Sequence, residues 1–73
     1  MEIFSKRFKE LRIESGLSIS KIAKEIGVSV STISRIEKCQ GIIRLRILVK
    51  IAMYFNICID FFLGMTNERK KLK

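Results

Sequence analysis

Residues 26–37 read IGVSVSTISRIE, and this stretch fits two different secondary structures. Its β-branched residues alternate with serines, as in a strand: Val28, Val30 and Thr32. Its isoleucines instead follow the three-to-four spacing of a helix: Ile26, Ile33 and Ile36. Ser29 favours the helix, because it stands directly after a Gly turn, where a helix N-cap belongs. A strand would also need partner strands, and nothing nearby supplies them. The stretch therefore predicts a helix that begins near Ser29.

Helical spacing of apolar residues extends over the rest of the chain. Four further helices are predicted, over residues 3–14, 19–26, 45–55 and 60–63. Three of them are followed by Gly and one by Asn, which are the residues that most readily take the left-handed conformation at a helix end. The expected fold class is all-α, a compact five-helix domain. Residues 1–65 form this domain, and residues 66–73 are expected to be a solvated basic tail.

Composition narrows the function classes. The 73 residues include 15 Lys and Arg against 7 Asp and Glu, a net charge of +8, which points to a polyanionic partner such as nucleic acid. An anionic membrane surface is the competing interpretation. There is no His, and Cys39 and Cys58 stand alone, so neither a metal site nor any other cofactor is expected. Without His or clustered carboxylates, no enzyme activity and no small-molecule substrate are expected.

The sequence also bears on localisation. No secretory signal is visible at the N-terminus, and no apolar run approaches the length of a membrane span. We therefore expect a soluble, cytoplasmic protein without a disulfide and without membrane insertion.

Two short helices joined by a turn with Gly form a helix-turn-helix. Ala23 is small enough for the second helix to approach the third, and Gly27 tolerates the turn. The outer face of the third helix is then left to enter the major groove of DNA, where each base pair shows a distinct pattern of hydrogen-bonding groups.

The segment 16–37, GLSISKIAKEIGVSVSTISRIE, resembles the helix-turn-helix of the lambda-repressor-like, or XRE-type, transcriptional regulators. The resemblance continues in FKELR (8–12), LVKIA (48–52) and DFFL (60–63), so that it covers roughly residues 4–63. It implies a five-helix domain that binds double-stranded operator DNA as a homodimer.

The resemblance also assigns roles to individual residues. It implies base-facing positions on the third helix, namely Val30, Ser31, Ser34 and Arg35. It implies capping and phosphate contact by Ser29 and Thr32. The following loop matches one that runs along the DNA backbone through Lys38, Gln40 and Arg44. Arg12 and Glu37 match a structural ion pair between the first helix and the end of the third.

The sequence departs from the family pattern at five places. Ile19 stands where Gln is usual, Cys39 where Gly is common, Ile43 where Pro is common, and Cys58 where a Ser-like cap is usual, and Val30 makes the first base-facing position apolar. The first change is expected to remove a polar contact of the second helix. The next two put the conformation of the loop after the third helix in question.

Several apolar residues exceed what a core of this size needs, Ile42 among them. Those expected to form a two-fold dimer interface are Ile43, Ile47, Tyr54, Phe61 and Met65. The alternative is that some of them only enlarge the core.

The resulting hypothesis is a sequence-specific DNA-binding transcriptional regulator, a repressor that binds a palindromic operator through the major groove. The alternative is a protein-interaction module of the same fold that sequesters a related regulator. Ile19 and Val30 favour the alternative, whereas the net charge of +8 and Arg35 favour DNA binding.

Overall fold

The computed structural model describes residues 2–72, and within them the regular secondary structure is entirely helical. The five helices are α1 (Glu2–Glu14), α2 (Ile19–Ile26), α3 (Val30–Glu37), α4 (Leu45–Phe55) and α5 (Ile59–Phe62). The predicted all-α fold class is confirmed, and the strand interpretation of residues 26–37 is excluded. Met1 and Lys73, the outer ends of the predicted domain and tail, lie outside the described residues. No helix within residues 2–72 has the length and hydropathy needed to cross a membrane.

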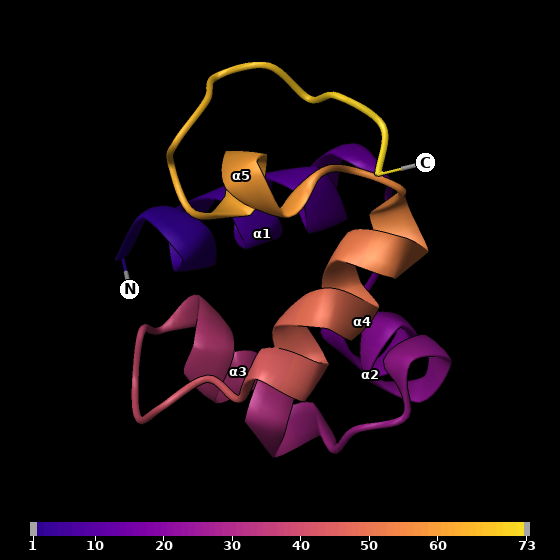
Figure 1. Cartoon of the computed structure of the whole chain (residues 1–73). Coiled ribbons are helices and arrows are strands. Elements are labelled where there is room, and N and C mark those ends of the chain that lie inside the picture. Colours follow the sequence, from indigo (N-terminus) through magenta and orange to yellow (C-terminus); the bar gives the residue numbers. More distant parts are fainter. Residues whose placement is uncertain (1, 73) are drawn as a thin grey trace.

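The second and third helices lie at one end of the molecule and the fifth helix lies at the other (Figure 1). Figure 1 shows α2 and α3 at the lower end and α5 with the following segment at the upper end. α4 runs between the two ends, and α1 passes beside α5. The predicted helix-turn-helix therefore lies opposite the C-terminal segment.

The core is built from one buried stripe of each helix. Its largest fully buried side chains are Phe4, Phe8, Ile22, Ile33, Ile51 and Phe62. The rings of Phe4 and Phe8 are stacked with centroids 6.0 Å apart, and the Phe62 ring lies 5.6 Å from that of Phe4. Because each such side chain stabilises the fold by about 1.5–3 kcal/mol, this cluster holds the short helices together.

All five helices in residues 2–72 end in the same way. Each is followed by a residue in the left-handed conformation: Gly16, Gly27, Cys39, Asn56 and Gly64. The next residue then donates its backbone N–H to a carbonyl five residues earlier at 2.9–3.1 Å, which is the Schellman arrangement. Gly and Asn suit this position, whereas Cys39 carries an ordinary side chain at φ 57°.

The C-terminal segment is largely exposed and lies against the rest of the domain. Residues 66–72 run back over the upper end of the molecule (Figure 1). The Cys58 backbone N–H donates to the Lys70 carbonyl at 2.7 Å, and Leu72 N–H donates to the Asn56 carbonyl at 3.4 Å. Leu72 is half-buried and packs against the core. The expected tail is therefore a strap that pairs with the connection between α4 and α5.

Arg7 fixes the start of this strap. Its guanidinium donates hydrogen bonds to the carbonyls of Phe61 and Thr66 and to Oδ1 of Asn67, the last at 2.7 Å. The same group lies 4.3 Å from the centroid of the Phe61 ring, and the Arg69 guanidinium lies 5.6 Å from it. Phe61, assigned to a dimer interface by the sequence, is consequently a core residue with 6% of its surface exposed. This corrects one of the five interface assignments.

The helix ends generate a stability prediction. Cys39→Gly is expected to raise the free energy of unfolding by about 0.5–1 kcal/mol, because the strain of a left-handed non-Gly residue exceeds the entropy that Gly loses on folding. Asn56→Gly is the matched control and should change it by less than about 0.5 kcal/mol, since Asn tolerates this conformation. Urea denaturation of the three proteins measures both changes. An equal or lower stability of the Cys39→Gly protein contradicts the prediction.

Candidate nucleic-acid interface

The start of α3 is fixed by a hydroxyl cap. The Ser29 side chain accepts a hydrogen bond from the Thr32 backbone N–H at 3.2 Å. The Ser29 hydroxyl also lies 2.8 Å from that of Thr32 and 3.1 Å from that of Ser31. Ser29 is thus an N-cap, and the three hydroxyl groups form one cluster at the exposed start of the helix.

The two faces of α3 differ in composition. Ile33 and Ile36 are buried against the core. The four residues predicted to face bases lie at positions i, i+1, i+4 and i+5, which share one face of a helix: Val30, Ser31, Ser34 and Arg35. Ser31 and Arg35 are exposed, Val30 is 50% exposed, and Ser34 is half-buried. The buried isoleucines therefore turn a small, polar surface with one guanidinium group outward.

The far end of α3 is tied to α1 by an ion pair. Arg12 Nε lies 2.5 Å from Glu37 Oε2, and Arg12 Nη2 donates to Glu37 Oε1 at 3.1 Å. Arg12 Nη1 donates to the Leu17 carbonyl at 2.8 Å. Only 13% of the Arg12 side chain and 6% of the Glu37 side chain are exposed. The two-pronged geometry thus sets the position of the end of α3 relative to α1.

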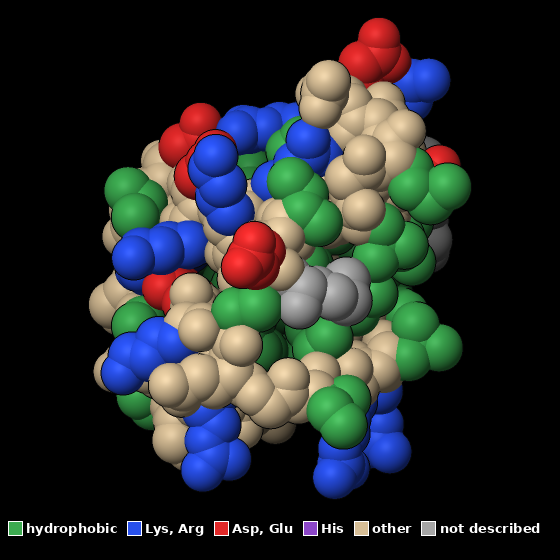
Figure 2. Space-filling view, turned by 90° about the vertical axis from the view of Figure 1, so that its left-hand side faces the viewer, with side chains coloured by type: hydrophobic (Ala, Val, Ile, Leu, Met, Phe, Trp, Pro, Cys, Tyr) green, Lys and Arg blue, Asp and Glu red, His purple; other side chains and the backbone are tan. Residues whose placement is uncertain are grey.

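The charged residues around α3 are almost all basic. Between Glu25 and Asp60 the sequence holds a single acidic residue, Glu37, and Arg12 neutralises it. The same interval holds five basic residues: Arg35, Lys38, Arg44, Arg46 and Lys50. None of the five forms an ion pair with a residue in 2–72. In Figure 2, the lower end carries Lys and Arg side chains and no Asp or Glu on the face shown. This end of the molecule is suited to a polyanion.

The loop between α3 and α4 adds exposed polar groups beside the helix. Lys38, Gln40 and Arg44 are all exposed. Arg44 occupies the N-cap position of α4 without a side-chain cap hydrogen bond, and the first turn of α4 has no acidic residue. The loop residues that the sequence assigned to the DNA backbone therefore follow directly on the exposed face of α3.

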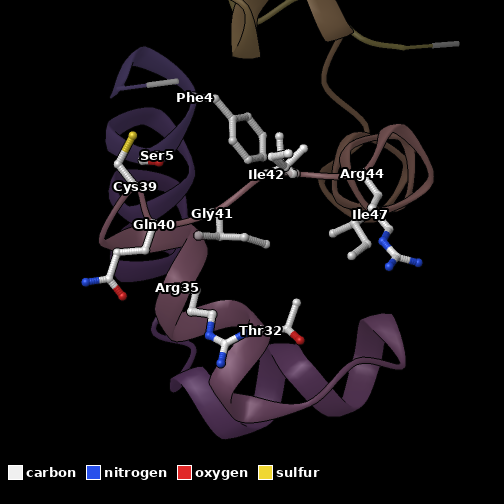
Figure 3. A pocket seen from close by; sticks show the side chains of 12 residues that line it. Phe4, Ser5, Thr32, Arg35, Cys39, Gln40, Gly41, Ile42, Arg44 and Ile47 are labelled. Atoms are coloured by element: carbon white, nitrogen blue, oxygen red, sulfur yellow. The ribbon is translucent and has the colours of Figure 1, made fainter.

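A hollow of about 640 Å³ opens between α3, this loop and the start of α4. Figure 3 shows Arg35 on the α3 side and Arg44 on the α4 side, with the Phe4 ring pointing in from α1. Its wall also includes Ile36, Ile43 and Ile47. Two of the predicted interface residues, Ile43 and Ile47, are thus half-buried lining of this hollow.

The remaining predicted interface residues, Tyr54 and Met65, are exposed. The structure adds two exposed apolar residues that the sequence analysis did not assign, Leu45 (71%) and Met53 (56%). With Val49 they lie at i, i+4 and i+8 of α4, so a helical projection of residues 45–55 groups them in one row but does not show whether that row is buried or exposed. Hydrophobic side chains also gather on the right-hand side of the face in Figure 2.

A family model for helix-turn-helix domains matches residues 8–62, which is most of the chain. The protein belongs to the lambda-repressor-like helix-turn-helix family. It is thus a DNA-binding, regulator-type domain with α2 and α3 as its helix-turn-helix. No curated protein and no solved structure gave a significant match. Within residues 2–72, no group of His, Cys, Asp and Glu side chains could hold a metal ion.

The ion pair behind α3 can be tested by removing one partner. Glu37→Ala is expected to lower the free energy of unfolding by about 2–3 kcal/mol, because it leaves the largely buried guanidinium of Arg12 without its carboxylate. Glu25→Ala removes the exposed i, i+4 pair with Lys21 and should cost less than about 0.5 kcal/mol. Thermal and urea unfolding measure both values. Similar losses of unfolding free energy in the two variants would show that the buried ion pair stabilises the fold no more than the exposed one.

Proposed function

We propose that the protein is a sequence-specific transcriptional repressor that binds a palindromic operator as a homodimer and places α3 in the major groove. The observation that carries the proposal is the outer face of α3. It presents small hydroxyl side chains and the guanidinium of Arg35, which forms no ion pair with a residue in 2–72. The single carboxylate between Glu25 and Asp60, that of Glu37, is paired with Arg12. Occupancy of the operator would then compete with RNA polymerase.

Base recognition is assigned to four side chains. Arg35 donates two hydrogen bonds to O6 and N7 of a guanine, a contact typically worth about 1–3 kcal/mol of discrimination. Val30, which is half exposed at the start of the helix, contacts a thymine methyl group. Ser31 and Ser34 donate to or accept from neighbouring base edges.

Phosphate contacts are assigned to both ends of α3. At its start lie the hydroxyl groups of Ser29 and Thr32, and after its end lie Lys38, Gln40 and Arg44. These residues set the register of the helix on the duplex, while the base contacts supply the specificity. The cations of the strap lie at the opposite end of the molecule and are not part of this interface (Figure 1).

Dimerisation is assigned to exposed apolar side chains near α4. Tyr54 keeps its predicted role, and Leu45 and Met53 join it because they are exposed on the same helix. Met65, exposed in the segment after α5, is a further candidate. Ile43 and Ile47 take part only at the rim of the hollow. A two-fold axis through this face would place two α3 helices about one turn of DNA, ~34 Å, apart.

The same exposed apolar surface is what a module that sequesters a related regulator would use. Val30 on the outer face of α3 supports this second candidate, because it replaces a polar reading position with an apolar one. The two functions differ in whether the chain alone selects a DNA sequence.

Selection from a random pool of DNA duplexes tests the proposal. The chain is expected to enrich an inverted repeat with half-sites about one turn apart, and affinity should fall steeply between two salt concentrations. Light scattering on the complex should report two chains per duplex.

Arg35→Ala should weaken binding to the selected site by about 5–150-fold and abolish preference at one guanine position, as the loss of a bidentate contact requires. Lys70→Ala removes the same charge from the strap at the other end and should change affinity less than threefold. Equal effects of the two substitutions, or no enriched sequence at low salt, would reject the repressor in favour of the sequestering module.

A further inference from the structure

The hollow beside α3 brings apolar and cationic side chains together. Its volume of about 640 Å³ lies in the range of pockets that hold small molecules. One part of its wall is apolar and comes from α1, α3, the loop and α4: Phe4, Ile36, Ile42, Ile43 and Ile47. The polar part includes two guanidinium groups, those of Arg35 and Arg44.

The charge of the hollow is uncompensated. No Asp or Glu lines it, and neither Arg35 nor Arg44 forms an ion pair with a residue in 2–72. By contrast, Arg7, Arg12 and Arg69 all have partners inside the chain. The two arginines of the hollow come from different elements, Arg35 from α3 and Arg44 from the start of α4, as Figure 3 shows.

One residue of the apolar wall, Ile42, is almost fully exposed to solvent. Ile42 belongs to the lining of the hollow and yet has 96% of its surface exposed. A molecule seated in the hollow would cover this side chain and the accessible edges of Ile43 and Ile47. A ligand with an apolar body and an anionic group would therefore bury apolar surface on one side of the hollow and pair with an arginine on the other.

We propose that the hollow binds a small organic acid, namely a carboxylate, sulfonate or phosphate carried by an apolar body, and that this ligand opposes DNA binding. The acid group pairs with Arg35 and Arg44, and the apolar body packs on Ile42, Ile43 and Ile47. The regulatory part rests on the proposed function, since Arg35 is the base-reading residue and Arg44 a phosphate contact. One guanidinium cannot bind the acid and a guanine at once, so ligand and DNA exclude each other.

Binding is tested without DNA, using 8-anilinonaphthalene-1-sulfonate as an aromatic acid and N-phenyl-1-naphthylamine as the same ring system without the sulfonate. The folded chain is expected to bind one sulfonate probe and to bind the neutral probe at least tenfold more weakly. Amide shifts in NMR spectra should concentrate at Thr32, at residues 40–44 and at Ile47. Shifts centred on the exposed face of α4 instead, or equal affinity for both probes, overturn the site.

Two variants test the cationic and the apolar part of the hollow separately, and a third variant is the control. Arg44→Gln should weaken the sulfonate probe about tenfold, as expected for a charge-assisted hydrogen bond. Ile42→Ser should weaken both probes, and its exposed position leaves the fold intact, which circular dichroism confirms. Arg46→Gln is the matched control, because it removes a charge two residues away on a residue that does not line the hollow. Equal weakening by Arg44→Gln and Arg46→Gln shows general attraction of an anion to a cation and overturns the site.

Competition is tested with the selected duplex. The apparent dissociation constant for DNA should rise in proportion to the concentration of the sulfonate probe above the concentration that fills half of the hollows. The neutral probe should leave this dissociation constant unchanged. Probe binding in the hollow with unchanged DNA affinity overturns the regulatory part. If the chain binds the probe but selects no DNA sequence, the repressor is rejected and the acid site stands. If the chain selects a DNA sequence but does not bind the probe, the acid site is rejected and the repressor stands.

Discussion

The seating of α3 on the core is the constraint on which the rest of the structure depends. α3 has only eight residues, and isolated helices of that length are not stable in water. Its helical form therefore comes from the burial of Ile33 and Ile36 and from the cap at Ser29. The Arg12–Glu37 ion pair then fixes its angle. The exposed face of α3 exists only because the opposite face is held in this way.

The helix boundaries could be predicted because their signals are local. Ser18 and Ser29 accept hydrogen bonds at the starts of α2 and α3, and a left-handed residue ends every helix of the described chain. Each of these signals involves residues no more than five apart in sequence. For the same reason the outer face of α3 followed from the spacing of its isoleucines. Local chemistry thus determined both the fold class and the position of the exposed face of α3.

The C-terminal strap and the burial of Phe61 could not be predicted in this way. They depend on Arg7, whose partners Phe61, Thr66 and Asn67 lie 54–60 residues further along the chain. No spacing rule connects an arginine of the first helix to those positions. The apolar residues of α4 were missed for a different reason, because a row such as Leu45 and Met53 is equally compatible with a core stripe and with an exposed one. Only the packing of the other helices decides between them.

The distribution of partners among the arginines shows how much of the positive charge belongs to the proposed interface. Arg7, Arg12 and Arg69 are engaged within the chain, so the net charge of +8 overstates the cationic surface at the α3 end. That end offers Arg35, Lys38 and Arg44 without ion-pair partners in residues 2–72. If all three contact DNA, one copy neutralises few phosphates, and the slope of log affinity against log salt is only about −0.9 per contact. A single copy would therefore bind weakly, which supports the proposal that two copies occupy one palindromic site.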